Sequence, residues 1–370
     1  MVGTVIVLGK TPVMGLYYRI IIVNVGCGGC KARKAARLGH HPISQLPSIL
    51  DRETHLSKPD ILAVAKLHPF YLEALQTLYT VHDRSHAGDA VAFAALAPKI
   101  VGIAATGESL VPSALLAQLP NLKLISVFGV GYDGVDTQAA IARGVPVTHT
   151  PDVLTDDVAD LAIGLLLSVA RHIPQAGEYV RAGHWPSGPM ALGRKVSGAR
   201  VGIVGLGRIG QAIARRAQAF DMSIAYTARS EKPDSGYIYY PSAKALAAEV
   251  DFLVVITPGG AGTRRLIDGD VLAALGPDGF LINVARGSVV DEVALIKALQ
   301  SGVIAGAALD VFENEPNVPQ ALWSLPNVVL TPHMASATRQ TRQAMADLAF
   351  ANMKAGLAGQ PLPTPVPECL

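Results

Sequence analysis

The chain has 370 residues, half of them apolar and 16% charged, which suits a compact protein of two domains and excludes an intrinsically disordered chain. Its formal net charge of +2 gives no reason to expect nucleic acid or a membrane surface as a partner, and no apolar stretch reaches the roughly 18 residues that span a bilayer. Three cysteines cannot build a disulfide framework, so we expect the reducing cytoplasm as the location.

The first 57 residues differ in composition from the rest of the chain. Asp51 is the first acidic residue, and the segment contains a Cys27/Cys30 pair followed by a basic cluster of Lys31, Arg33, Lys34 and Arg37. Acid-poor basic segments are typical of organellar transit peptides, although residues 17–25 favour a strand. A single Cys-x-x-Cys is weak evidence for a metal or redox site. We interpret residues 1–57 as a poorly defined extension without a role in the chemistry, and predict no metal site.

Strand and helix patterns alternate from residue 59 onward. Strands are predicted at 60–65, 100–105 and 122–128, and helices at 69–78 and 112–119. A long apolar helix follows at 156–171, with Thr155 as its N-cap, and we expect it to connect two lobes. Alternation of this kind predicts βαβ units and a parallel sheet.

Residues 200–230 carry the most specific local motif. A β-branched strand at 201–204 precedes glycines in the order G-x-G-x-x-G, then an alanine-rich amphipathic helix and a second strand at 223–226. The glycines allow a tight turn, close approach of the backbone to a pyrophosphate, and close helix packing, while the helix N-terminus offers free N–H groups. We therefore predict a dinucleotide site at Gly205, Leu206, Gly207, Arg208, Ile209 and Gly210.

The end of the second strand indicates which dinucleotide is bound. Residues 227–230 read Thr-Ala-Arg-Ser and lack the carboxylate that normally binds the ribose 2′-hydroxyl of NAD. Arg229 can pair with a 2′-phosphate and Ser230 can donate a hydrogen bond to it. We therefore expect NADP(H) to be preferred, with NAD(H) possible because an exposed arginine also permits mixed use.

The alternation resumes after this motif. Strands are predicted at 251–256, 280–284, 304–309 and 328–330, and helices at 270–275 and 291–301. A final helix at about 337–357 has apolar residues at helical spacing, and we expect it to return to the first lobe.

With these motifs placed, the chain from about residue 59 resembles the D-isomer-specific 2-hydroxyacid dehydrogenases, in particular the glyoxylate/hydroxypyruvate reductase branch. The resemblance rests on GLGRIG at 205–210, INVARGSVVDE at 282–292, ALDVFENEP at 308–316 and TPHMASAT at 331–338, and for the branch on FGVGYDGVD at 128–136. It implies an α/β fold of two doubly wound parallel-sheet lobes. A Rossmann cofactor domain at 156–336 would be inserted in a flavodoxin-like substrate domain at 58–155, completed by 337–370. The implied reaction is NADPH-dependent reduction of glyoxylate to glycolate and of hydroxypyruvate to D-glycerate.

Three residues at neighbouring strand ends fit this chemistry. The planar fork of Arg286 suits a carboxylate and can polarise a carbonyl, and His333 has a pKa near the working pH and can donate a proton. A carboxylate of Glu315 on the other ring nitrogen would fix the tautomer and raise the imidazolium pKa. Taken singly, each residue fits a surface ion pair or a turn equally well. Ligands of parallel-sheet proteins bind at the carboxyl ends of the strands. The three residues together at such ends therefore predict an active site.

The resemblance implies further roles. Val130 and Gly131 would hold the substrate carboxylate through backbone N–H groups, next to Arg286 and His333. Cofactor contacts are implied for Thr257, Val284, Ala285, Arg286, Asp310 and His333, with Asp310 near the nicotinamide amide. A homodimer built around the helix after Thr155 is implied, and Trp185 either closes the partner's pocket or is only buried in the interface.

Two alternatives remain open. The substrate can instead be that of another family branch, of the phosphoglycerate, phenylpyruvate or D-lactate type. A dinucleotide-sensing corepressor, in which binding matters more than turnover, is the alternative from a different functional class.

Overall fold

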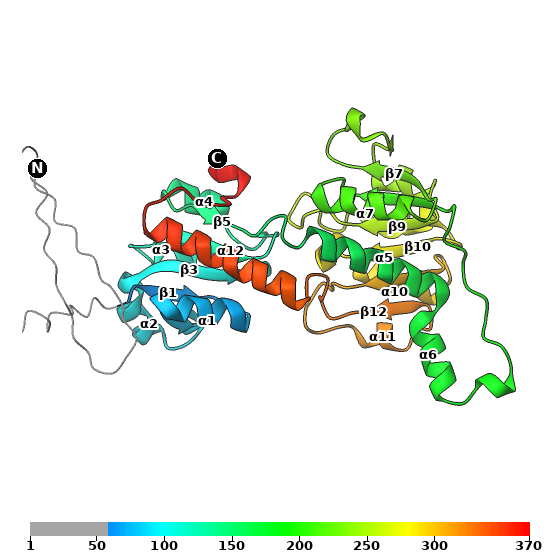
Figure 1. The fold of residues 1–370 in the computed structure, drawn as a ribbon, viewed down its shortest axis with the longest axis horizontal. Coiled ribbons are helices and arrows are strands. Elements are labelled where there is room, and N and C mark those ends of the chain that lie inside the picture. Colours follow the sequence, from blue (N-terminus) through cyan, green and yellow to red (C-terminus); the bar gives the residue numbers. More distant parts are fainter. Residues whose placement is uncertain (1–57) are drawn as a thin grey trace, which may run out of the picture. The chain divides into compact units, whose positions relative to one another are not determined.

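The computed structural model describes residues 58–370, so the predicted extension with Cys27 and Cys30 lies outside the described residues. The described chain forms two parallel sheets, of five and seven strands, with helices packed on them (Figure 1). The predicted α/β class with two parallel-sheet lobes is therefore confirmed. Within residues 58–370, no helix is both long enough and apolar enough to cross a membrane.

The five-stranded sheet has the order β2-β1-β3-β4-β5, which is the flavodoxin-like order. Its strands are β1 (Asp60–Ala63), β2 (Thr80–Asp83), β3 (Ile100–Thr106), β4 (Leu124–Phe128) and β5 (Val147–Thr148). The helices of this part of the chain are α1 (Pro69–Leu78), α2 (Ala90–Leu96), α3 (Ser113–Ala117) and α4 (Thr137–Ala142).

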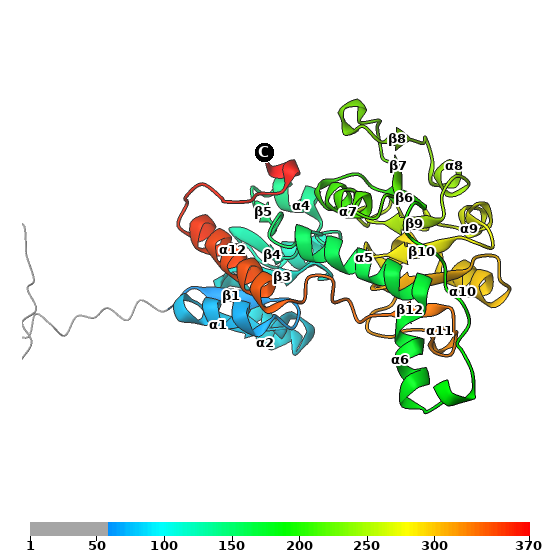
Figure 2. The ribbon, with the colours of Figure 1, turned by 45° about the vertical axis from the view of Figure 1, so that its right-hand side comes forward.

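The last helix, α12 (Arg339–Leu357), packs against α1 and against β4 of the five-stranded sheet (Figure 2). The hydroxyl of Ser126 on β4 donates a buried hydrogen bond of 3.0 Å to the carbonyl of Ala349 on α12. Helix α12 is thus fixed to the sheet that residues 60–148 form, which brings residues of α12 to the edge of this sheet.

The seven-stranded sheet has the order β12-β11-β10-β9-β6-β7-β8, which is the Rossmann order extended by one strand. Its strands are β6 (Arg200–Val204), β7 (Ser223–Thr227), β8 (Ile238–Tyr239), β9 (Phe252–Val255), β10 (Phe280–Asn283), β11 (Gly306–Leu309) and β12 (Val328–Leu330). The helices between these strands are α7 (Arg208–Gln218), α8 (Ala243–Ala247), α9 (Gly269–Leu275), α10 (Glu292–Gln300) and α11 (Gln320–Trp323).

Both faces of the seven-stranded sheet are buried, as a parallel sheet requires. Phe252 and Val254 of β9 belong to the core that includes residues of the helix after Leu154 and of α7. The alternate residues Leu253 and Val255 belong to the core beneath α8, α9 and α10. This burial on both sides explains why the strand reads as a continuous apolar run in the sequence.

The long helix α5 (Thr155–Arg171) packs against α7, β10 and β11. Its buried residues recur at helical spacing, at Val158, Ala162, Leu165, Leu166 and Val169. The predicted N-cap was wrong: Thr155 is the first helical residue, and the cap position, Leu154, makes no side-chain hydrogen bond. Asp156 and Asp157 in the first turn stabilise the positive end of the helix dipole instead.

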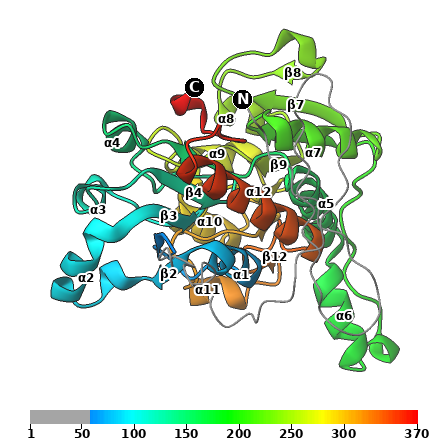
Figure 3. The same ribbon diagram turned by 60° about the vertical axis from the view of Figure 1, so that its left-hand side comes forward.

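A second helix, α6 (Ile173–Arg181), follows α5 after a turn at His172 and extends away from the seven-stranded sheet (Figure 3). It buries none of its own residues. Helix α6 was not predicted, and neither were the short elements β2, β5, β8, α2, α4, α8 and α11. Short or exposed elements contain too few apolar residues to show a period, so their sequences carry little signal.

Candidate active site

The register of the seven-stranded sheet aligns the carboxyl ends of its strands. Val204 lies beside Thr227 on one side and Val255 on the other, and Asn283 lies beside Val255 and Leu309. Leu309 in turn pairs with Leu330. The predicted cofactor-binding and catalytic segments all begin within a few residues of these strand ends. The motifs that are separated in the sequence therefore meet at one edge.

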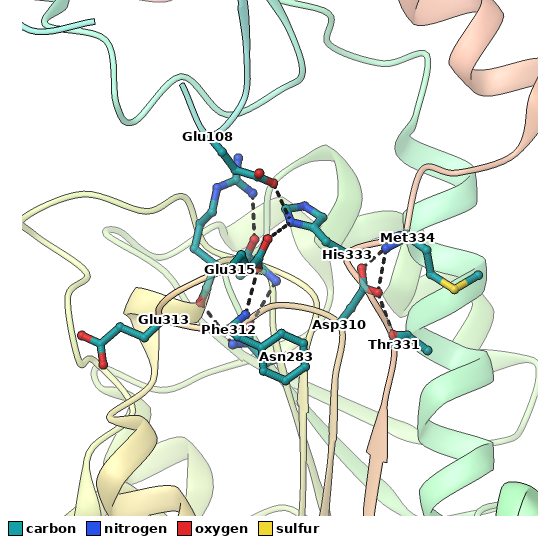
Figure 4. Close-up of polar contacts among 12 residues, drawn as sticks. Glu108, Asn283, Asp310, Phe312, Glu313, Glu315, Thr331, His333 and Met334 are labelled. Atoms are coloured by element: carbon teal, nitrogen blue, oxygen red, sulfur yellow. Dashed lines mark hydrogen bonds and ion pairs between the residues drawn. The ribbon is translucent and has the colours of Figure 1, made fainter. Parts of the chain in front are cut away.

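His333 is held by the loop that follows β12. Its backbone lies in the left-handed region, with φ of 48°, and its N–H donates to the carbonyl of Asp310 at 2.8 Å. The buried carboxylate of Asp310 accepts hydrogen bonds from the Thr331 hydroxyl at 2.6 Å and from the backbone N–H groups of Met334 and Ala335 at 2.9 Å (Figure 4). Asp310 thus fixes the loop that orients the histidine ring. A left-handed non-glycine residue held by such contacts is typical of a functional site.

The predicted pairing of Glu315 with His333 is present. Oε2 of Glu315 lies 2.7 Å from Nδ1 of His333, and Oε1 accepts the N–H of Phe312 at 2.9 Å. Because the carboxylate faces Nδ1, this nitrogen carries the proton and Nε2 is left for a ligand.

A second carboxylate that sequence reasoning missed reaches the same nitrogen. Glu108, in the loop after β3 of the other sheet, places Oε1 2.7 Å from Nδ1 of His333 (Figure 4). Burial alone would lower the pKa of His333, but the hydrogen bonds to Glu108 and Glu315 outweigh it and raise the pKa to about 9. The hydrogen bond to His333 in turn lowers the pKa of Glu108. At neutral pH His333 is therefore a cation between two carboxylates.

Arg286, which follows β10 of the seven-stranded sheet, is paired with Asp133, which follows β4 of the five-stranded sheet. Its Nε donates to Oδ2 of Asp133 at 2.9 Å, and its Nη1 donates to the carbonyl of Ala285 at 2.8 Å. The remaining nitrogen, Nη2, lies against Gly131, where a Cβ would come within 1.8 Å of it. Glycine at this position therefore lets the guanidinium lie against the loop after β4, with Nη2 left for a ligand.

These side chains line one cleft of about 1830 Å³. Ten predicted residues line it, and these are Val130, Gly131, Ile209, Arg229, Thr257, Val284, Ala285, Arg286, Glu315 and His333. The other predicted cofactor residues, Gly205, Leu206, Gly207, Arg208, Gly210, Ser230 and Asp310, are not among its lining residues. Asp310 is fully buried beneath the His333 loop.

The glycine-rich loop has the geometry that a pyrophosphate requires. Gly205 has a φ of +106°, and a Cβ there would lie 2.9 Å from the carbonyl of Ile256. A Cβ at Gly207 would meet no heavy atom within 4 Å, so this position faces open space. Gly207 is also the N-cap of α7 and makes no side-chain hydrogen bond, which leaves the first N–H groups of the helix available. The residues present therefore fit a dinucleotide.

The end of β7 places cationic groups beside this loop. Arg229 and Ser230 are exposed, and Arg229 lines the cleft. Lys232, which sequence reasoning missed, reaches back so that its ammonium lies 2.6 Å from the carbonyl of Leu206. A second cation thus lies against the glycine-rich loop, two residues beyond the 227–230 stretch that lacks a carboxylate.

Sequence reasoning could have found only some of the missed residues. Asp133 lies in the quoted segment 128–136, just after β4, where its strand-end position was a usable signal. Glu108 also follows a strand end, but nothing local distinguishes it from a surface acid. Two histidines to which the sequence assigned no role, His68 and His149, also line the cleft, and Nδ1 of His149 lies 2.9 Å from the carbonyl of Val130.

The cluster of Glu108, Glu315 and His333 also has the residue types of a metal site. Their ligand atoms lie within 4.8 Å of one another, a spacing that a divalent cation could use. The two carboxylates already share the proton on Nδ1, so a cation would have to displace that proton. We therefore interpret the cluster as a hydrogen-bonded charge cluster.

Comparisons with known proteins identify the family of the chain. Residues 163–335 match the family model described as D-isomer specific 2-hydroxyacid dehydrogenase, NAD binding domain. The 2-ketogluconate reductase of Gluconobacter oxydans (strain 621H) is 47% identical over 310 residues, which is 84% of this chain and 99% of that protein. A glyoxylate/hydroxypyruvate reductase of Arabidopsis thaliana is 51% identical over 267 residues, or 72% of this chain and 84% of the relative.

A solved structure is similar to most of this chain. The NADPH-dependent glyoxylate/hydroxypyruvate reductase of Sinorhizobium meliloti, in complex with NADP and malonate, has a TM-score of 0.79 and 48% sequence identity. The match covers 85% of this chain and 98% of that one. The likeness thus extends well beyond the segment matched by the family model.

Proposed function

This chain belongs to the D-isomer specific 2-hydroxyacid dehydrogenases, and on that premise we propose that it reduces glyoxylate to glycolate and hydroxypyruvate to D-glycerate with NADPH. The observation that carries the proposal is the convergence of Arg286, Glu315 and His333 on the cleft that Ile209 of the glycine-rich loop also lines. The names of the Arabidopsis and Sinorhizobium relatives support the choice of substrates, and that of the Sinorhizobium enzyme supports the choice of cofactor.

Each side chain has one role in this reaction. Nη2 of Arg286, which has no hydrogen-bond partner within residues 58–370, binds the substrate carboxylate and polarises the carbonyl oxygen. Backbone N–H groups at Val130 and Gly131 assist in holding the carboxylate. His333 donates the Nε2 proton to the oxygen on C2 as that oxygen becomes an alkoxide. Glu315 and Glu108 keep the ring charged and hold it by Nδ1.

NADPH, when bound, supplies the hydride that is added to C2. The loop from Gly205 to Gly210 would hold its pyrophosphate, and Thr257, Val284 and Ala285 would line its nicotinamide end. Arg229, Ser230 and Lys232 would bind the 2′-phosphate, because two cations and a hydroxyl there favour a phosphate over a bare ribose. Asp310 supports the cofactor end indirectly, through the loop that carries His333.

A steady-state assay of the purified protein tests this function. NADPH and NADH oxidation are followed with glyoxylate, hydroxypyruvate, phenylpyruvate, pyruvate and phosphohydroxypyruvate. We expect NADPH turnover to be fastest with the first two acids, and His333→Ala to lower kcat by about 10²- to 10⁴-fold. Preference for one of the other acids would favour another branch of the family. Nucleotide-dependent protein binding without turnover of any acid would support the corepressor alternative.

We also propose a homodimer, with the contact at α6 and the loop that follows it. The apolar face of α5 is covered within its own chain, so that helix alone no longer argues for a partner. Large apolar side chains are exposed instead at Ile173, Val180, Trp185 and Leu192. The cytoplasmic location and the domain limits at 155/156 and 336/337 stay predictions.

A further inference from the structure

Arg342 on α12 differs from the other cations that line the cleft. Lys66, Arg229 and Arg339 are exposed to solvent, and Arg286 is paired with Asp133. The guanidinium of Arg342 is half-buried, and within residues 58–370 no acidic side chain lies within 4.0 Å of it and no hydrogen bond engages it. The guanidinium makes a cation–π contact with Phe128, but its N–H groups have no acceptor among the described residues. Donors withdrawn from water without an acceptor are energetically unfavourable, so this group is arranged for an acceptor that enters the cleft.

The groups around Arg342 are either apolar or already engaged. Its guanidinium carbon lies 5.8 Å from the centroid of the Phe128 ring, and Met345 is a buried residue of the same cleft wall. The ring of His68 stacks on Phe128, and its Nδ1 accepts the N–H of Phe70. The free nitrogen of a neutral His68 therefore carries a proton and cannot accept from Arg342.

Asp310 and Glu108, the two acids whose charges act on Arg342, hold other groups. Both oxygens of Asp310 accept hydrogen bonds from the His333 loop. Oε1 of Glu108 is bound to Nδ1 of His333. The charges of His333, Arg286 and Arg342 all act to lower the pKa of Glu108, which places the free guanidinium in the same charge cluster as the two proposed catalytic cations.

In the proposed reaction, Arg286 and His333 bind the carboxylate and the carbonyl oxygen of the substrate. The third substituent of C2, the group that begins with C3, has no binding residue assigned to it yet. We propose that Arg342 forms a distal subsite of the substrate pocket that binds an oxygen on C3 of the 2-oxo acid, either a hydroxyl or a second carboxylate. The proposal rests on the proposed function, and it names the substrate class of that site. A carboxylate can take two hydrogen bonds from the planar fork, and a hydroxyl takes one.

Hydroxypyruvate and pyruvate differ by a single oxygen on C3, so their ratio of kcat/KM isolates this contact. Arg342→Met should lower the ratio of hydroxypyruvate to pyruvate by about tenfold or more, as expected when a hydrogen bond to a charged group is lost. Arg342→Lys, which keeps the charge but lacks the fork, should lower it less. The matched control is Arg339→Met on the same helix, where an exposed arginine lies 5.9 Å from the Phe70 ring. It should leave the ratio at the wild-type value.

A binding measurement gives a second readout that does not depend on turnover. Titration calorimetry compares tartronate, a 2-hydroxy acid with a second carboxylate, with glycolate, which lacks it. Arg342→Met should weaken tartronate binding by about tenfold or more relative to glycolate. An unchanged selectivity in both assays, or an equal loss for all acids, would overturn the subsite. Wild-type protein that reduces no 2-oxo acid would overturn the proposed function instead, and the tartronate titration would still decide the subsite.

Discussion

Oε1 of Glu108 lies 2.7 Å from Nδ1 of His333, although Glu108 follows β3 of the five-stranded sheet and His333 follows β12 of the seven-stranded one. Glu315 approaches the same nitrogen from the side of the seven-stranded sheet, also at 2.7 Å. One N–H cannot donate fully to two carboxylates, so the two acids share its proton and both stabilise the charged ring. The charge state of His333 therefore depends on contacts from both sheets.

The first prediction concerns the pH profile of reduction. His333 must be protonated to donate, and its pKa is raised to about 9, so activity should fall as the pH rises through about 9. Glu315→Gln should move this alkaline limb to lower pH, because the imidazolium loses a stabilising charge. Glu108→Gln should move it in the same direction but less, since its side chain is 56% exposed against 20% for Glu315.

The measurement is kcat/KM for glyoxylate between pH 6 and 10. Glu73→Gln, an exposed glutamate on α1, is the matched control and should leave the profile unchanged. An unmoved alkaline limb in Glu315→Gln would show that Glu315 is structural and that the proton-donor role of His333 lacks this support.

The second prediction concerns stability. The pKa of His333 in the folded state, about 9, lies above its ordinary value of 6.5. The charged ring therefore contributes its full stabilisation below about pH 6.5, and this contribution is lost as the pH rises through 9. Thermal unfolding should show a lower Tm at pH 9.5 than at pH 7. His333→Gln cannot titrate and should show a smaller fall; an equal fall in both proteins would contradict the shifted pKa.

The third prediction concerns Arg286 and Asp133. Asp133→Asn removes the charge that holds Nε of Arg286, so the guanidinium should be less well fixed, and KM for glyoxylate should rise by about tenfold. Arg286→Ala should damage both KM and kcat, because its contact to the substrate strengthens as the carbonyl becomes charged. Glu313→Gln removes an exposed acid of a neighbouring loop and serves as the control. A KM of Asp133→Asn equal to that of the control would show that the ion pair does not position Arg286.

The fourth prediction concerns cofactor choice. Arg229→Ala should raise KM for NADPH by roughly 10- to 150-fold, the loss expected for one charge-assisted contact, and leave KM for NADH nearly unchanged. Arg264→Ala, which removes an exposed arginine paired with Glu313, should affect neither. Equal KM values for NADPH and NADH in the unmodified enzyme would mean that the missing carboxylate at the end of β7 does not select NADP(H).

The fifth prediction concerns assembly. Light scattering should give a mass of about twice that of one chain. Substituting Val180→Asp and Leu192→Asp together should shift the protein toward a monomer, because both side chains are exposed apolar groups in the proposed contact, 55% and 96% exposed. Val91→Asp on α2, 80% exposed in the other lobe, is the control. A wild-type monomer would exclude the dimer, and a dimer that withstands the double substitution would place its interface elsewhere.

The sequence by itself determined the elements whose signal is local. The helix at 69–78 was predicted with the bounds it has, and the strand, glycine-rich loop and helix around Gly205 followed from apolar periodicity and turn chemistry. The order of four motifs indicated the family and hence the three residues Arg286, Glu315 and His333. Each of these inferences depends on residues that are close in the chain, where burial period and backbone conformation are encoded directly.

The tertiary structure alone decided which distant groups meet. The pairs Glu108–His333 and Asp133–Arg286 join loops of different sheets. Among the described residues the guanidinium of Arg342 has no acid partner, because Glu108 and Asp310 hold other groups. The tertiary structure also shows that the apolar face of α5 is buried within its own chain, whereas apolar side chains on α6 are exposed. No local pattern encodes such contacts, because they depend on strand register and on how all the helices pack together, a sum over many side chains that single-residue preferences do not contain.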